Sequence, residues 1–250
     1  MRAHTIRTRF KKDIISEVGL PDKQTGRVLI LIGGLPSIPS KPDVLKFWVS
    51  AGYVCVFPRF RGTWESGGEF LKRDPVLDVF DIVDEMVSSK SILNLYTGET
   101  EKIKVSSIYV VGGSFGGTGA LLASAHPKVK KVVALSPVID WSIDSEAEPF
   151  EFFQRFTKNA FGEAYRSKAS SWKKLQHNKI YSPIQKGVKI IGEKILIVHA
   201  ENDSVVPIDP VYSFVRDTNS ELVEMKKGGH FGLNDTRKKK FTNIIIKHLG

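Results

Sequence analysis

The chain has 250 residues, a formal net charge of +10 and a single cysteine, Cys55. One cysteine cannot form an internal disulfide or a multi-cysteine zinc site, so a disulfide-rich secreted scaffold is excluded. No apolar run approaches the ~18 residues that a membrane-spanning helix needs, and the N-terminus lacks the apolar core of a secretory signal. We therefore expect one domain, residues 1–250, located in the cytoplasm.

The basic excess is compatible with a nucleic-acid or anionic-membrane partner, or simply with a soluble surface. Its clusters are short and lie far apart in the chain, at residues 7–12, 128–131 and 237–240. No RNA-binding aromatic signature and no zinc-finger spacing accompanies them. We interpret the clusters as solvated faces and expect no nucleic-acid partner.

Several segments have the apolar, β-branched composition of strands. Residues 5–10 and 14–20 are typical of a hairpin. Residues 27–32, RVLILI, predict a strand that is buried on both faces. Further strands are predicted at 53–57, 107–111, 132–135, 195–198 and 222–225. The alternation of strands with helical patterns predicts an α/β fold with a largely parallel sheet.

Two polar residues mark predicted helix starts. Asp74 can cap a helix that has Pro75 at its first position and continues to Val87. Asp235 can cap a closing helix that runs to about Leu249.

The segment 141–181 departs from the alternation of strands and helices. It has no convincing buried strand but carries many aromatic side chains, which are Phe150, Phe152, Phe153, Phe156, Phe161, Tyr165 and Trp172. So many rings need a surface to pack on, which favours a helical insertion over disorder. We expect a short cap that helps to shape a substrate pocket.

The sequence Gly112-Gly113-Ser114-Phe115-Gly116 follows a predicted strand and precedes a helix-compatible stretch. This is the G-x-S-x-G pattern in the context of a nucleophile elbow, a strained turn that exposes a serine. The helix N-terminus stabilises negative charge that develops near the serine. Ser114 is therefore the candidate nucleophile.

A serine nucleophile requires a histidine base and a carboxylate that orients it, in the chain order serine, acid, histidine. Asp203 follows a predicted strand in the loop HAENDSVVP and is the candidate acid, with Glu201 and Asp140 as alternatives. His230, in the loop KGGHFG, is the candidate base. We expect His199 to precede Asp203 too closely to face it.

A tetrahedral intermediate also requires two hydrogen-bond donors for its oxyanion. One is expected to be the backbone N–H of Phe115, directly after the nucleophile. The other is expected in the loop Gly33-Gly34-Leu35-Pro36, with Leu35 as the preferred donor and Gly34 as the alternative.

With these residues in place, the chain resembles the α/β-hydrolase superfamily over nearly its whole length. Segments that carry the resemblance are GGLP, AGYVCVFPRFRGTWESGGEF, GGSFGG, ALSPVIDW, YSPI, HAENDSVVP and GGHFG. Within the superfamily, they are similar to the catalytic domain of prolyl oligopeptidase-like serine hydrolases and related esterases. The resemblance implies an α/β-hydrolase fold and a triad of Ser114, Asp203 and His230.

Two departures distinguish the chain from the peptidases of that group. Those peptidases usually carry a large propeller, and this chain has no residues to build one. They also often use a tyrosine as an oxyanion donor, whereas residues 61–67 contain none and leave Trp64 or Ser66 as substitutes. Both departures favour a small-molecule esterase.

The sequence therefore predicts a serine hydrolase that cleaves a carboxylic ester or related acyl bond of a small molecule. No metal or organic cofactor is implied. One alternative is a peptidase or acyl-amide hydrolase that acts on short peptides. Another is a non-catalytic binding protein on a hydrolase scaffold. The sequence does not indicate the oligomeric state.

Overall fold

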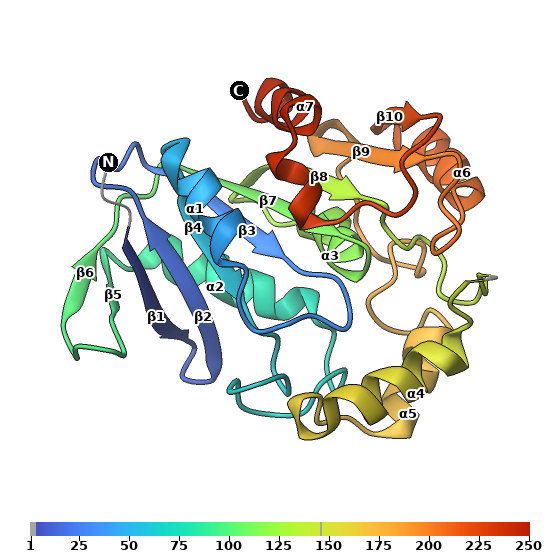
Figure 1. Ribbon diagram of the computed structural model, residues 1–250, viewed down its shortest axis with the longest axis horizontal. Coiled ribbons are helices and arrows are strands. Elements are labelled where there is room, and N and C mark those ends of the chain that lie inside the picture. The colour runs from blue at the N-terminus through green and yellow to red at the C-terminus, as the bar shows by residue number, and fades with distance from the viewer. Residues whose placement is uncertain (1–3, 146) are drawn as a thin grey trace.

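The computed structural model describes residues 4–145 and 147–250. Within them, an eight-stranded sheet runs in the order β1-β2-β4-β3-β7-β8-β9-β10 (Figure 1). Its strands are β1 (His4–Phe10), β2 (Ile14–Leu20), β3 (Arg27–Ile32), β4 (Val54–Pro58), β7 (Ser107–Gly113), β8 (Val129–Leu135), β9 (Ile195–Ala200) and β10 (Glu221–Met225). β1, β2 and β4 pair antiparallel, and the pairs from β4 to β10 are parallel. The predicted hairpin and the mostly parallel sheet are confirmed.

The strand β3 shows why the predicted runs are continuously apolar. Val28, Ile30 and Ile32 pack into the core on one face of the sheet, and Leu29 and Leu31 pack into the core on the other. All five side chains are fully buried. Because helices cover both faces of a parallel sheet, neither set of alternating residues can be polar.

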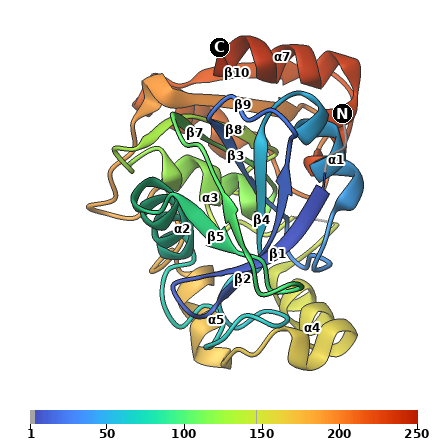
Figure 2. The same ribbon diagram turned by 90° about the vertical axis from the view of Figure 1, so that its left-hand side faces the viewer.

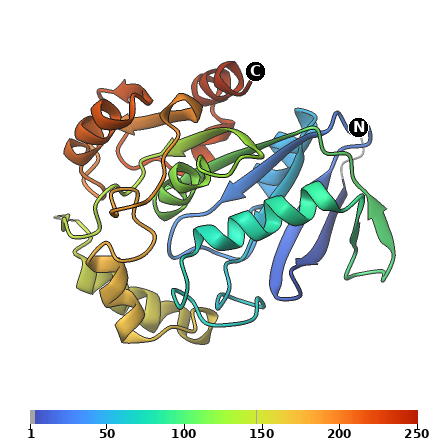
Figure 3. The same cartoon turned by 180° about the vertical axis from the view of Figure 1, so that it is seen from behind.

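Helices cover the two faces of the sheet. They are α1 (Pro42–Ser50), α2 (Val76–Ser88), α3 (Phe115–Ala123), α6 (Asp209–Thr218) and α7 (Lys239–Leu249), while α4 (Phe150–Phe161) and α5 (Ala169–Gln176) lie below the sheet. Side chains of α1 and α7 share one core with the sheet, while those of α2, α3 and α6 share the other. Figure 3 shows α2 crossing the back of the sheet. None of the helices in the described part of the chain is long and apolar enough to cross a membrane.

The predicted cap of the closing helix is wrong. Asp235 lies inside a short 3-10 helix, η3 (Leu233–Arg237), and its Oδ2 accepts the N–H of Gly232 at 2.8 Å. α7 begins only at Lys239. The other predicted helix start, with Asp74 as the cap and Pro75 as the first residue, is wrong by one residue, because α2 begins at Val76. Asp74 Oδ1 still accepts the Val76 N–H at 3.0 Å.

The segment 141–181 is largely helical in its described residues, with position 146 outside them. It contains α4, a 3-10 turn η1 (Gly162–Ala164) and α5. Figures 1 and 2 place α4 and α5 together, below the sheet. The larger buried rings of the segment 141–181 belong to the same core cluster as the side chains of α3. These rings are Trp141, Phe150, Tyr165, Trp172 and Tyr181. This packing is the physical reason for its ordered structure.

Candidate active site

Ser114 lies at the junction of β7 and α3. Its backbone has φ 57° and ψ −123°, a conformation that is strained for a residue with a Cβ. The Ser114 N–H donates to the carbonyl of Leu135 in β8 at 2.8 Å, and the Ser114 carbonyl accepts N–H bonds from Gly117 and Thr118 in the first turn of α3. These bonds hold the strained turn in place.

Two glycines allow this turn to pack closely. A Cβ added at Gly112 would lie 1.9 Å from the carbonyl oxygen of Gly116, and a Cβ added at Gly116 would lie 2.2 Å from that of Ile32. Both obstacles are backbone atoms, which cannot rotate away. The elbow therefore requires glycine at both positions.

We expect Gly116→Ala to destabilise the protein by at least about 3 kcal/mol, because the new methyl group overlaps the backbone of β3. Urea denaturation measures the free energy of unfolding. Gly232→Ala is the matched control, since a Cβ there meets no atom within 4 Å. Equal stability of the two variants would contradict this account of the elbow.

Asp203 lies in the turn after β9, with its side chain buried. Its Oδ1 accepts the N–H groups of Val205 at 3.0 Å and Val206 at 2.9 Å, and its Oδ2 lies 2.9 Å from His230 Nδ1 and 3.4 Å from His199 Nε2. Burial by itself favours the neutral acid, but hydrogen bonds from the two histidines and from Val206 outweigh it and hold the pKa of Asp203 well below its usual value. Asp203 is therefore a carboxylate at neutral pH.

His230 lies in the loop after β10 and is partly exposed. A carboxylate only accepts hydrogen bonds, so His230 Nδ1 carries the proton in the contact with Asp203, and in the neutral imidazole Nε2 then has the lone pair. Among the described residues, the hydrogen bonds and the ion pair of the His230 side chain are with Asp203 and not with either alternative acid. Glu201 is exposed, and Asp140 accepts hydrogen bonds from Ser142 and Asn178. A neutral imidazole held in this way is able to take a proton from a hydroxyl group.

The expectation about His199 is wrong. Its Nε2 lies 3.4 Å from Asp203 Oδ2 and also 2.9 Å from the carbonyl oxygen of Val206. The chain turns at once after β9, with the Asp203 N–H donating to the carbonyl of Ala200, and this turn brings the two side chains together. Because His199 is fully buried, it contacts the acid but not the solvent.

Asn202, which the sequence analysis did not single out, joins the loops of the candidate acid and the candidate base. Its Oδ1 accepts the N–H groups of Gly228 at 3.0 Å and Gly229 at 3.1 Å. Both glycines have positive φ, so the loop needs glycine there to turn toward Asn202. The signal in the sequence is an asparagine next to the acid and a Gly-Gly pair next to His230.

We expect Asn202→Ala to reduce kcat about tenfold with a smaller change in KM, because a looser loop positions His230 less firmly. Steady-state kinetics with a chromogenic ester gives both constants. Asn202→Asp keeps an acceptor in the same place and is expected to retain more activity than the alanine variant. An Asn202→Ala enzyme with wild-type kcat would show that these bonds do not position the base.

The loop of His230 packs directly against the elbow. A Cβ added at Gly113, the residue before Ser114, would lie 2.8 Å from the Cα of Gly232. Within the described residues, the His230 side chain bonds only to Asp203, so a hydrogen bond from Ser114 to His230 is not formed here. Catalytic hydrogen bonds are often long in the absence of substrate.

The candidate oxyanion donors lie around Ser114. Phe115 is the first residue of α3, where the backbone N–H has no partner within the helix. Gly34 approaches so closely that a Cβ added there would lie 3.4 Å from Ser114 Cβ, and Leu35 lines the same cavity as Ser114 and Phe115. Among the described residues, the N–H groups of Leu35 and Phe115 donate to no backbone acceptor.

The substitutes suggested for a tyrosine donor do not serve that role. Trp64 Nε1 donates to the carbonyl of Ser37 at 2.9 Å, and Ser66 Oγ donates to the carbonyl of Arg59 at 2.7 Å. Ser66 is also fully buried. Both donors are used in holding loops together.

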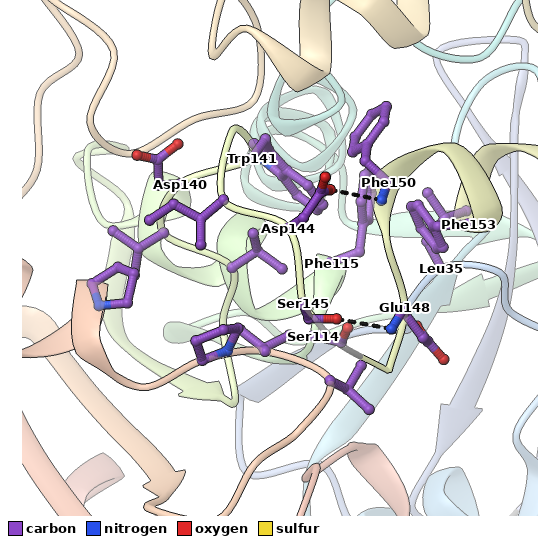
Figure 4. Close-up of a pocket in the computed structure, with 17 residues that line it drawn as sticks. Leu35, Ser114, Phe115, Asp140, Trp141, Asp144, Ser145, Glu148, Phe150 and Phe153 are labelled. Carbon is purple, nitrogen blue, oxygen red and sulfur yellow. Dashed lines mark hydrogen bonds between the residues drawn. The ribbon is translucent and has the colours of Figure 1, made fainter.

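Ser114, Phe115 and Leu35 line a cavity with an empty volume of about 640 Å³ (Figure 4). Apolar side chains from the segment 141–181 and from the loop after β9 form much of the rest of its wall, including Trp141, Phe150, Phe153, Val206 and Pro207. Figure 4 shows how the loop before α4 is held: Asp144 accepts the N–H of Phe150, and Ser145 accepts that of Glu148.

A sequence model of the prolyl oligopeptidase family matches residues 40–249, most of the chain. The chain belongs to the prolyl oligopeptidase family. This membership supports serine hydrolase activity. No curated protein matches the chain.

Solved structures similar to this member of the prolyl oligopeptidase family include the Pyrococcus furiosus esterase Pf2001, with a TM-score of 0.65 and 16% identity over 99% of this chain and 90% of that one. Another is the Pyrococcus horikoshii acylaminoacyl peptidase, with a TM-score of 0.65 and 18% identity over 99% of this chain but only 42% of that one. A third is XC6422 from Xanthomonas campestris, described as an α/β serine hydrolase without a lid, with a TM-score of 0.60 and 15% identity over 99% and 95% of the two chains. The fold is that of the α/β hydrolases.

Proposed function

We propose that the protein is a serine hydrolase that cleaves a carboxylic ester or related acyl bond of a small molecule through an acyl-enzyme. Ser114 is the nucleophile, His230 the general base and acid, and Asp203 the residue that orients His230. The N–H groups of Phe115 and Leu35 hold the oxyanion, with that of Gly34 as the alternative to Leu35.

The observation that carries this proposal is the Asp203–His230 contact at 2.9 Å, on a loop packed against the strained turn of Ser114. The stability of the fold does not explain why a strained serine, a buried carboxylate and a partly exposed histidine lie together. Together they have the chemical roles of an acyl-transfer site.

In the first half of the reaction, Ser114 Oγ attacks the acyl carbon while His230 Nε2 takes the hydroxyl proton. The carbonyl oxygen becomes an oxyanion, which accepts hydrogen bonds from Phe115 and Leu35. His230 then gives the proton to the leaving alcohol oxygen as the bond from carbon to that oxygen breaks. Water repeats these steps on the acyl-enzyme, releasing the carboxylic acid and restoring Ser114.

The proposal is tested by labelling with a fluorophosphonate and by turnover of p-nitrophenyl esters of graded chain length. We expect one covalent adduct per chain, located on Ser114 by peptide mass spectrometry. Activity is expected to fall on acidification, because a protonated His230 cannot accept the serine proton. Folded protein that neither reacts with the label nor hydrolyses any ester of the series would refute the proposal.

A second candidate function, amide or short-peptide hydrolysis, is favoured by the family itself. The same residues perform it, with an amine as the leaving group in place of an alcohol. Comparing kcat/KM for an ester and the amide of the same acyl group decides between the two.

A further inference from the structure

A groove adjoins the cavity of Ser114, and we call it the isoleucine groove. It lies between the loop after β8, the segment Pro183–Ile184 and the helix α6. Five residues line both the groove and the cavity, and they are Ile139, Asp140, Ile143, Pro207 and Pro210. Because the two share so much of their wall, a molecule bound at Ser114 can extend into the groove.

The room at Ser114 is small compared with the room in the groove. The space open to a water-sized sphere is about 70 Å³ in the cavity of Ser114 and about 620 Å³ in the isoleucine groove. Figure 4 shows Asp140, which lines both, on the opposite side of the cavity from Leu35. The groove therefore continues the cavity away from the proposed oxyanion donor Leu35, so a chain in the groove leaves that donor free.

The walls of the isoleucine groove present apolar side chains to solvent. Ile143 is 46% exposed and Ile184 is 47% exposed. They come from different loops but line the same groove, together with the buried side chains of Ile139 and Phe214. Single exposed isoleucines are common on protein surfaces, whereas apolar side chains that gather in a groove indicate a binding surface. An alkyl chain that covers these walls is removed from water, which favours its binding.

The charged side chains along this path are all carboxylates. In the cavity and the groove together they are Asp140, Asp144, Glu148, Asp209 and Asp217. No basic side chain of the described residues lines either of them. This is the reverse of the whole chain, which has a net charge of +10. The carboxylates repel an anionic group, so a chain that ends in a carboxylate or a phosphate does not fit the groove.

We propose that the isoleucine groove is the subsite for an extended apolar arm of the substrate, and that Ile143 and Ile184 contact this arm while Ser114 attacks the acyl carbon. This inference rests on the proposed function and narrows it. The substrate class is an ester or related acyl compound with an alkyl chain of medium length in one arm and no anionic group on that chain. Ile143 and Ile184 lie away from the bond that breaks, so they determine specificity.

The first test varies the length of each arm while the other arm stays constant. The acyl series consists of p-nitrophenyl acetate, butanoate, hexanoate and octanoate, and the alcohol series consists of ethyl, butyl, hexyl and octyl acetate. We expect kcat/KM of the wild-type enzyme to rise at least about tenfold from four to eight carbons in one of the two series. A flat or falling profile over this range in both series would overturn the proposal.

The second test adds a negative charge to the end of the chain. In the series that shows the rise, the eight-carbon ester is compared with mono-p-nitrophenyl octanedioate or with 7-carboxyheptyl acetate, which end in a carboxylate. We expect kcat/KM to fall at least about tenfold, because the carboxylate would lose water in a groove that offers it no positive partner. Equal values for the two esters would overturn the assignment of the groove.

Variants connect the chain-length preference to the groove. Ile184→Asp places a charge on the wall, so we expect the ratio of kcat/KM between the eight-carbon and four-carbon esters to fall at least about fivefold. Ile246→Asp is the matched control, because Ile246 lies on α7, is 40% exposed and lines neither the groove nor the cavity. It is expected to keep the wild-type ratio within about twofold. A ratio that Ile184→Asp leaves unchanged would contradict the proposal.

A crystal structure separates failure of the subsite from failure of the proposed function. The Ser114→Ala protein is crystallised with hexyl hexanoate, which has a six-carbon chain in each arm and needs no turnover to bind. A chain carbon within about 4.5 Å of the Ile143 or Ile184 side chain supports the subsite even if wild-type protein hydrolyses no ester. An ester with neither chain in the groove, or no bound ester at saturating concentration, refutes the subsite even if the ester series is hydrolysed.

Discussion

Replacing Ser114 by alanine is expected to reduce kcat for ester hydrolysis by a factor on the order of 10⁵, because no group is left to form the acyl-enzyme. The fold is expected to survive. The Ser114 side chain makes no hydrogen bond that the alanine would lose within the described residues, and alanine is no larger than serine. Initial rates with p-nitrophenyl butanoate measure the loss, and far-ultraviolet circular dichroism checks the fold.

Ser142→Ala is the control for Ser114→Ala. Ser142 is exposed, and its hydroxyl donates only to Asp140 at 2.6 Å. We expect its activity to stay within about threefold of wild type. If the Ser114→Ala protein kept more than about 1% of wild-type turnover, the hydrolysis would have to occur at another residue.

Replacing Asp203 by asparagine is expected to reduce kcat by a factor on the order of 10⁴. Its amide can donate to His230 Nδ1, which favours the tautomer with the proton on Nε2, and that tautomer cannot accept the proton of Ser114. The carboxylate that stabilises the imidazolium is also lost. Steady-state kinetics and the rate of fluorophosphonate labelling both measure the effect. Asp140→Asn is the control and is expected to cost less than tenfold, since Asp140 bonds to Ser142 and Asn178.

The same substitution is expected to change how stability depends on pH. Because folding lowers the pKa of Asp203, its carboxylate stabilises the fold above the unfolded pKa of about 3.9, and this contribution is lost as pH falls below that value. Urea denaturation should therefore show the advantage of wild type over Asp203→Asn beginning to decrease near pH 5 and still decreasing at pH 3, because the folded pKa lies lower still. A difference that stays constant over this range would show that the ionised form is not preferred in the fold.

The parallel sheet could be predicted from the sequence because a strand that is buried on both faces is apolar at nearly every position, as in RVLILI of β3. The elbow was also visible, because its glycines are required by backbone contacts as short as 1.9 Å. The sequence analysis did not single out α1 and α6. Both are short, with 9 and 10 residues, so each repeats its apolar pattern over only a few turns.

Contacts across loops were harder to predict from the sequence. The approach of His199 to Asp203 depends on the path of the chain after β9, and spacing alone suggested that the two side chains diverge. The hydrogen bonds of Arg59 Nε and Nη2 go to Pro39 and Glu17, which lie 20 and 42 residues away in the chain, and they leave Nη1 buried without a partner among the described residues. Such a donor cannot be distinguished in the sequence from an arginine whose hydrogens are all in use.

The packing of the segment 141–181 limits how this enzyme can be re-engineered. The Tyr181 ring stacks on Phe115 with centroids 4.4 Å apart, and its hydroxyl donates to the Phe115 carbonyl at 3.0 Å. The segment is thus joined to the residue next to the nucleophile, so exchanging it for a lid from a relative would disturb the elbow itself. Phe152 and Phe156, which are exposed on α4, are the positions where the surface of the segment can be redesigned without that penalty.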